Sequence, residues 1–268
     1  MGPLVVMNLL REPRLQGITI GSPEFFRIQN ELIAQRPALR FCYDLWYHTL
    51  LDDPAVRNAP RDARFLELGS GGSRLKELDH RIITSDVSPG IADLVVDARK
   101  LPFPDASLHA IFLTHVFHHI PDVSQFLHEA ERVLVPGGVI GMIEVAATPF
   151  ARFFFNHFHP EPFSPQLGWT FAQNDSMMDS NQALSWIVFE RDLLRFQREH
   201  PGLILEEKRW LPWLPYLLSG GVTRRDLLPS AVVPAIIATD RGLRGLYAIF
   251  ALHWFIRLRK RHPPMGKT

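Results

Sequence analysis

The sequence contains very little cysteine and almost no net charge. Cys42 is the only cysteine among 268 residues, so a disulfide within the chain is excluded and a reducing compartment is expected. Lysine and arginine number 29 against 28 aspartates and glutamates, so the chain lacks the basic field that attracts nucleic acid. We therefore expect a partner other than nucleic acid.

Long apolar runs are also missing. No stretch of 18 apolar residues occurs, which argues against an ordinary transmembrane helix. The first residues, MGPLVVMNLLREPRLQG, show no basic region before the apolar stretch and no small-residue cleavage site, so no signal peptide is expected. These absences indicate a cytoplasmic protein, and 268 residues are enough for one domain with a sizeable core.

The most informative stretch joins a short apolar run to a cluster of glycines. Residues 65–68, FLEL, predict a buried strand, and GSGGS at 69–73 predicts a tight turn where the backbone can approach a ligand closely. Glu67 lies two residues before the first glycine, and its charge would repel phosphates but suit a cationic ligand. S-adenosylmethionine (SAM), which carries a sulfonium and an ammonium group and no phosphate, is such a ligand.

Two phosphate-binding motifs do not fit this turn. Arg74 occupies the position where the pattern G-x-G-x-x-G requires its third glycine. A P-loop needs G-K-[ST] at the start of a helix, and the only G-K-T, at 266–268, is followed by no helical pattern. The glycine turn therefore predicts neither a dinucleotide site nor a P-loop.

Four further strands follow, and two of them end near an acid. Residues 82–86 and 94–98 predict strands that end near Asp86 and Asp97. An acid at a strand end beside a glycine-rich turn is where doubly wound folds bind a ribose. Residues 110–113 and 139–145 predict two more strands, with a helical pattern between them over 123–134 that Pro136-Gly137-Gly138 ends.

In this order, the motifs resemble the class I SAM-dependent methyltransferases, in particular the small-molecule branch typified by ubiquinone-biosynthesis-type enzymes. The resemblance covers residues 62–146 and is carried by ELGSGGS, SDV, DARKLPFPDASLHAIF, HVFHHIPD and EAERVLVPGGVI. It implies an α/β fold with a doubly wound, mostly parallel seven-stranded sheet, and SAM as cofactor. Two features depart from the family: Ser73 replaces its third glycine, and the helices expected over 74–78 and 89–93 are short.

The resemblance also assigns residues to the cofactor, according to the part of SAM that they meet. Glu67, Gly69 and Gly71, with Ser70 between the glycines, hold the methionine end. Asp86 binds the ribose hydroxyls, and Asp97 and Ala98 contact the adenine. Thr114 and His115 belong to the loop that closes over the ligand.

Residues 1–61 form a helical cap in this interpretation. Two helices are expected within 23–51, with Ser22 as the cap of the first and Pro37 between them. These helices either pack on the edge of the sheet or form a lid over the SAM pocket. Residues 62–146 form the SAM-binding core, and residues 147–268 supply the substrate side and complete the sheet of one compact domain.

The last part of the chain combines an aromatic segment with an insertion. Residues 146–171 are dense in Phe, Trp, His and Pro and follow the carboxyl end of a strand, which favours a substrate pocket, while plain packing explains them equally well. Beyond them the patterns predict a helix over 181–200, a strand over 203–210, an insertion over 212–234, a helix over 235–248 and a final antiparallel strand over 250–259. The alternative for 245–256 is a membrane-seeking helix.

Histidines concentrate in two short segments. His115, His118 and His119 form H-x-x-H-H, but no acid or cysteine completes a recognisable ligand spacing, so no metal is expected. His118 and His119 are instead expected to seat the loop after the fourth strand. His159 is the candidate general base, because it falls in the substrate segment and a histidine titrates near neutrality. The candidate substrate contacts are His157, which is also an alternative base, Glu161 and Phe163.

Together these observations predict SAM-dependent methyl transfer to a small, apolar or lipid-like acceptor. A non-catalytic SAM-binding or regulatory protein of the same fold is the alternative, because the sequence shows no invariant catalytic residue to check. Trp210, Trp213 and Tyr216 in the insertion, together with the basic cluster 257–261, favour peripheral contact with an anionic membrane. The competing interpretation is that the aromatic residues fill a second small core.

Overall fold

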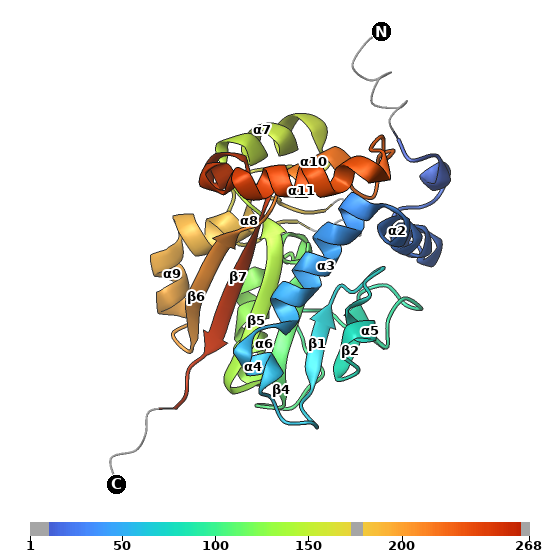
Figure 1. The fold of residues 1–268 in the computed structure, drawn as a ribbon. Coiled ribbons are helices and arrows are strands. Elements are labelled where there is room, and N and C mark those ends of the chain that lie inside the picture. Colours follow the sequence, from blue (N-terminus) through green and yellow to red (C-terminus); the bar gives the residue numbers. More distant parts are fainter. Residues whose placement is uncertain (1–10, 173–178, 264–268) are drawn as a thin grey trace.

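The computed structural model describes residues 11–172 and 179–263, and its centre is a seven-stranded sheet (Figure 1). The strand order is β3-β2-β1-β4-β5-β7-β6. Strands β1 to β5 pair in parallel, whereas β7 pairs antiparallel with both β5 and β6. The predicted doubly wound sheet is therefore confirmed. The strands are β1 (Phe65–Leu68), β2 (Ile82–Asp86), β3 (Leu94–Val95), β4 (Leu108–Thr114), β5 (Leu134–Val145), β6 (Leu203–Trp210) and β7 (His253–Lys260).

Helices surround the sheet, and most of them are short. The α-helices are α2 (Pro23–Gln35), α3 (Pro37–Leu51), α4 (Pro54–Arg57), α5 (Leu75–Leu78), α6 (Val123–Val133), α7 (Pro149–Phe158), α8 (Leu184–Trp186), α9 (Leu193–Glu199), α10 (Leu214–Ser219), α11 (Val233–Gly242) and α12 (Tyr247–Phe250). The 3-10 turns are η1 (Pro13–Leu15), η2 (Phe117–His119), η4 (Ser230–Val232) and η5 (Arg244–Leu246), and η3 (Ile187–Arg191) is a π-helical turn.

Three predictions around strands β2 to β5 are wrong in detail. The predicted helix over 89–93 is a series of bends, because Asp93 turns back and accepts hydrogen bonds from the backbone N–H of Thr84 (2.9 Å) and from Lys76 (2.7 Å). The third strand comprises two exposed residues at the edge of the sheet. The strand predicted over 139–145 starts earlier, since β5 begins at Leu134 directly after α6 and includes Pro136-Gly137-Gly138, where its register with β4 shifts.

Two long helices predicted in the second half are interrupted. The one over 181–200 is divided into α8, the π-helical turn η3 and α9, and the one over 235–248 ends at Gly242 and resumes as η5 and α12. The membrane-seeking helix over 245–256 is wrong, because residues from His253 onward form buried strand β7. Among the described residues, none of the helices is long and apolar enough to cross a membrane.

The two faces of the sheet bury different helices, because successive side chains of a strand point to opposite faces. Leu66 and Leu68 of β1 lie in one core cluster with residues of α6. Phe65 lies in another with Trp46 and Leu50 of α3. Glu67 therefore points to the face covered by α3. Helices α7, α10 and α11 form a separate layer at the carboxyl ends of the parallel strands (Figure 1), which places them over the edge where ligands bind in open α/β folds.

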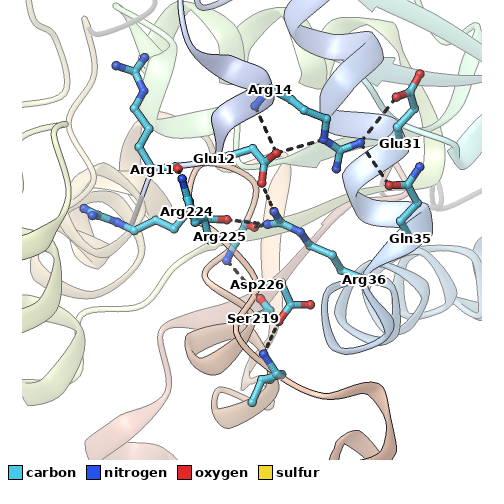
Figure 2. A network of polar contacts seen from close by, with 12 residues as sticks. Arg11, Glu12, Arg14, Glu31, Gln35, Arg36, Ser219, Arg224, Arg225 and Asp226 are labelled. Atoms are coloured by element: carbon cyan, nitrogen blue, oxygen red, sulfur yellow. Dashed lines mark hydrogen bonds and ion pairs between the residues drawn. The ribbon is translucent and has the colours of Figure 1, made fainter. Parts of the chain in front are cut away.

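A buried ion pair ties the N-terminal segment to the insertion between β6 and β7 (Figure 2). Arg36, between α2 and α3, pairs with Glu12, and both side chains are only 8% exposed. The same guanidinium donates to the backbone carbonyl oxygens of Gly221 (2.8 Å) and Arg224 (2.6 Å). One side chain thus holds together three segments that are far apart in the sequence.

Replacing Arg36 by leucine is expected to lower the free energy of unfolding by about 3 kcal/mol. The buried Glu12 carboxylate would keep only its pair with the more exposed Arg14, and the carbonyl oxygens of Gly221 and Arg224 would lose their donor. Arg27→Leu is the matched control: the Arg27 side chain is 57% exposed and its pairs with Glu24 and Glu31 lie on the surface, where such pairs contribute about 0–1 kcal/mol. Urea titrations of both variants measure the difference. Equal losses would contradict a structural role for the buried pair.

Candidate active site

The turn between β1 and α5 requires glycine at two positions. Gly69 and Gly71 have φ angles of 59° and 47°, a left-handed conformation that other residues rarely adopt. A Cβ atom at Gly69 would lie 2.6 Å from a methyl group of Val116, and one at Gly71 would lie 2.6 Å from the ring of Phe26. Phe26 belongs to α2, so α2 covers the turn as the predicted lid would, whereas α3 packs on the sheet.

Glu67 is a buried carboxylate directly before this turn. Its side chain is 1% exposed, and Oε2 has no hydrogen-bond partner among the described residues. Burial raises the pKa of Glu67 to about 8, although a hydrogen bond with Ser73 acts in the opposite direction. A carboxylate buried without a partner costs free energy, and a cation beside it would stabilise its charged form. The position fits a ligand with a cationic group.

The acid at the end of β2 supports the glycine turn directly. Asp86 accepts hydrogen bonds from the backbone N–H groups of Gly71 (3.1 Å) and Ser88 (3.0 Å). Ser70 is buried between the two glycines, and its N–H donates to the carbonyl of Ser85 at the end of the same strand (2.8 Å). The structure therefore brings Asp86 and the glycine turn together, as the sequence predicts for a ribose site.

The acid after β3 lies in a more exposed place. Asp97 pairs with Arg99 at 2.7 Å and its side chain is 48% exposed. A hydrogen bond from the Arg99 side chain holds the pKa of Asp97 below its ordinary value. Val96 beside it is buried and Ala98 is half-buried. These residues follow β3 at the same edge of the sheet as Asp86, since β2 and β3 pair in parallel.

The loop after β4 is held by a residue that sequence analysis missed. Glu144 of β5 is fully buried and accepts hydrogen bonds from the backbone N–H groups of Val116 (2.9 Å) and Phe117 (2.8 Å). His115 has a φ of 58° at the start of this loop. The Oγ1 of Thr114 and the Nε2 of His115 are buried and have no hydrogen-bond partner among the described residues. The only sequence signal for Glu144 was a single acid inside an apolar strand pattern.

Two histidines of this loop gather around two carboxylates. The Nδ1 of His118 lies 2.6 Å from Glu144, and its Nε2 lies 3.5 Å from Glu161. The Nε2 of His119 lies 3.7 Å from the same Glu161 oxygen. Burial lowers the pKa of His118, but the Glu144 and Glu161 carboxylates outweigh it and raise this pKa to about 10. Burial lowers the pKa of His119 to about 4. His118 thus seats the loop, as predicted, and an acid distant in the sequence joins the cluster.

The predicted substrate residues occupy different environments. His159 directly follows α7, and its Nδ1 accepts a 3.3 Å hydrogen bond from the backbone N–H of Glu161. Burial lowers its pKa. His157 is exposed, and its Nδ1 lies 2.7 Å from the carbonyl of Phe153. Phe163 is buried in the main core. Of the four, the structure brings only His159 and Glu161 close to the histidines after β4.

Most of the residues that favoured membrane contact have partners inside the fold. Trp213 is 8% exposed, stacks on Phe250 and belongs to the main core, while the half-buried Tyr216 packs against both core clusters. In the basic cluster at the end of β7, Arg257 pairs with Asp53 and Glu206, Arg259 pairs with Glu206, and Lys260 donates to the carbonyl of Leu134. Among the described residues that favoured membrane contact, Trp210 and Arg261 are exposed.

Part of the chain is similar in sequence to known methyltransferases. Residues 66–142 match a family described as a methyltransferase domain. The chain is 29% identical over 98 residues to 27-O-demethylrifamycin SV methyltransferase of Amycolatopsis mediterranei, an alignment that covers 36% of each protein. It is 33% identical over 111 residues to demethylmenaquinone methyltransferase of Deinococcus radiodurans, covering 34% of this chain and 45% of that protein. The chain thus spans less than half the length of these relatives.

The similarity of the fold extends further than that of the sequence. The crystal structure of geranyl diphosphate C-methyltransferase from Streptomyces coelicolor A3(2) superposes with a TM-score of 0.53 and 18% identity. The match covers 94% of this chain and 90% of that one. At this identity the comparison establishes the fold alone.

Proposed function

We propose that this chain, a class I methyltransferase of the small-molecule branch, transfers a methyl group from SAM to a small apolar acceptor. The observation that carries the proposal is Glu67, a buried carboxylate whose Oε2 has no hydrogen-bond partner among the described residues, next to a turn that requires glycine at two positions. Glu67 would pair with the cationic methionine end, where Gly69, Ser70 and Gly71 let the backbone approach. A phosphate ligand would bring a negative charge to this buried side chain in place of the cation that would stabilise its ionised form.

The remaining cofactor contacts follow the same edge of the sheet. Asp86 would accept hydrogen bonds from the ribose hydroxyls, and Asp97 with Ala98 would lie against the adenine. Thr114 and His115, with their unpartnered buried polar atoms, would close the site. SAM supplies an activated methyl group, and the protein orients the acceptor for in-line attack and receives the proton that the acceptor loses.

The acceptor side is the layer formed by α7 and the segment that follows it. Phe155 and Phe163 are buried there, and His159 lies 5.2 Å from Phe155 between ring centres. An apolar wall with a few polar groups suits a small hydrophobic acceptor. Relatives of this chain are named for demethylmenaquinone and a rifamycin, which are small molecules of this kind. Incubation of the protein with SAM and a metabolite extract tests the activity. A methylated product detected by mass is expected, whereas SAM binding without any product would indicate a non-catalytic role.

His159 is the proposed general base. Its Nδ1 carries the lone pair, since it accepts the 3.3 Å hydrogen bond from the Glu161 backbone, and an acceptor hydroxyl that displaces this long bond would deliver its proton there. We expect His159→Ala to lower the turnover rate by about a hundredfold with unchanged SAM affinity. Because burial lowers the pKa of His159, the wild-type rate should persist below pH 6.5. His128→Ala, which replaces an exposed histidine of α6, is the control, and an equal rate in both variants would refute the role.

Peripheral membrane contact remains a proposal, and we now place it on the cap surface. This surface consists of exposed large apolar residues of α7, α10 and the short elements η4, η5 and α12 that flank α11, which are Phe153, Phe158, Leu218, Val232, Leu246 and Ile249. Arg241 and Arg244 are exposed in the same layer, and cations of this kind attract anionic lipid. An apolar acceptor dissolved in a membrane would then meet the protein at the edge of the sheet where its site lies.

Phe153→Glu is expected to weaken co-sedimentation with anionic vesicles about tenfold, because a phenylalanine side chain that becomes buried in the membrane contributes roughly 1.5–3 kcal/mol to binding. Leu194→Glu is the control: Leu194 is 80% exposed on α9, outside the cap surface. Wild-type protein that stays in the supernatant at low and at physiological salt would exclude membrane contact. Equal losses in both variants would exclude the cap surface as its place.

A further inference from the structure

We propose that His118, His119 and Glu161 bind a divalent transition-metal ion of the zinc type. One ligand atom from each of the three residues lies within 4.8 Å of the other two. The site differs from the proposed cofactor contacts, and none of the three residues is assigned to SAM. The proposed methyl transfer requires no metal, so the two proposals stand independently.

The separations suit a shared ion better than direct hydrogen bonds. The Nε2 atoms of His118 and His119 lie 3.5 Å and 3.7 Å from Glu161 Oε2, which is beyond the usual N–H···O range of about 2.7–3.2 Å. Ligand atoms about 2.0–2.1 Å from a tetrahedral zinc ion are roughly 3.3 Å from one another. Small shifts of the side chains would therefore bring all three groups into coordination.

Each ligand is already oriented by a second group, as metal ligands in proteins usually are. His118 turns its other ring nitrogen, Nδ1, to the Glu144 carboxylate at 2.6 Å. The Oε2 of Glu161, the oxygen nearest the two histidines, also accepts hydrogen bonds from Ser180 (3.1 Å) and from Gln182, which fix the position of the carboxylate. The backbone of Asp179 forms a hydrogen bond with the ring of His119. With its Nε2 toward Glu161, the nitrogen left for Asp179 is Nδ1.

The donor set selects the class of ion. Two imidazoles and one carboxylate suit zinc, cobalt or iron, whereas magnesium prefers oxygen ligands alone. Three protein ligands leave a fourth position of a tetrahedral ion open, which is typical of sites that bind water or substrate. The side chains of Glu161 and His119 are 16% and 26% exposed, so the cluster is reachable by an ion from solvent.

The simpler interpretation is a histidinium, His118, held between two carboxylates without any metal. It accounts for the contacts of His118 with Glu144 and Glu161. It does not account for His119, whose Nε2 faces the same Glu161 oxygen from 3.7 Å, outside hydrogen-bond range. An ion shared by the three groups explains both histidines, and the experiment distinguishes the two interpretations.

The test uses the full chain, stripped of metal with a chelator and titrated with Co²⁺ while visible absorption is recorded. We expect one equivalent to bind with the strong d–d bands of a tetrahedral site, and Zn²⁺ to displace it. His119→Ala and Glu161→Gln should each weaken binding at least tenfold. The control His128→Ala should bind as the wild type does, and circular dichroism should show that all variants are folded.

Absence of stoichiometric binding, or equal binding by His119→Ala and the wild type, would overturn the metal site in favour of the histidinium. SAM binding measured on the same metal-free samples keeps the two proposals apart. A protein that binds SAM but no Co²⁺ refutes only the metal site, and a protein that binds Co²⁺ but no SAM refutes only the proposed function.

Discussion

The affinity for SAM is expected to rise about tenfold with each pH unit up to about pH 8, or roughly 300-fold between pH 5 and pH 7.5. The cause is Glu67, whose pKa is raised to about 8 by burial. Below this pH the free protein carries a neutral Glu67, while the cationic methionine end favours the carboxylate. Binding at pH 7 must therefore release about one proton.

Calorimetry in buffers of different ionisation enthalpy counts this proton. Glu67→Gln keeps the shape of the side chain but cannot titrate, so it is expected to bind SAM weakly and without proton release from this position. Any proton release that remains in this variant comes from other groups, and its difference from the wild type gives the contribution of Glu67. A wild-type affinity that does not change with pH, or a Glu67→Gln variant with the same slope, would show that Glu67 does not meet the cation.

Replacing Glu144 by leucine is expected to lower the free energy of unfolding by about 5 kcal/mol. The substitution leaves the backbone N–H groups of Val116 and Phe117 buried without acceptors, and each loss costs about 1–3 kcal/mol. It also removes the charged partner of His118, which is 2% exposed. A loss of this size consumes much of the stability of an ordinary domain.

Thermal and urea unfolding of Glu144→Leu measure this loss against a matched control. Asp105→Ala removes an acid whose side chain is 79% exposed in a surface pair with Arg132, so a change of about 0–1 kcal/mol is expected. Glu144→Gln should be intermediate, since one amide oxygen can still accept both backbone N–H groups. If Glu144→Leu and Asp105→Ala were equally stable, the buried carboxylate would not hold the loop.

The sheet could be predicted largely because its signals are local. Strands β1, β2 and β6 have the predicted bounds, and the glycine turn follows β1 as expected. Buried parallel strands are continuous apolar runs that glycine, proline or an acid ends. The register shift of β5 at Pro136 was not predictable, because it depends on pairing with β4 and not on the run itself.

The polar cluster of the site could be predicted only in part, because it joins residues distant in sequence. His118 and His119 were recognised as a motif, but their partners Glu144 and Glu161 lie 26 and more residues further on. The spacing of these residues along the sequence does not indicate that Glu144 of β5 and Glu161 of a loop lie beside the two histidines. No metal was expected because no acid lies at a recognisable ligand spacing from His118 and His119 in the sequence. In the structure Glu161, which is distant in sequence, lies beside both histidines.

The aromatic content of the insertion did not predict correctly which of its side chains are exposed. Trp213 and Tyr216 among leucines suggested an interface, yet both pack in the core because α10 folds back against α3 and α11. The exposed apolar residues of the cap come instead from single positions such as Phe153 and Ile249, which no contiguous run marks. Composition predicts how much apolar surface a segment has, and packing decides which side chains stay exposed.

Titration calorimetry of the purified chain with SAM and, separately, with NAD tests the central claim most directly. The claim is that the turn at Gly69 and Gly71 holds a cationic ligand against Glu67. We expect one SAM molecule to bind, Asp86→Ala to weaken its binding about five- to a hundredfold, and NAD not to bind, because it would bring phosphates to Glu67 in place of the cation that stabilises the ionised side chain. A protein that binds NAD but not SAM would contradict the claim.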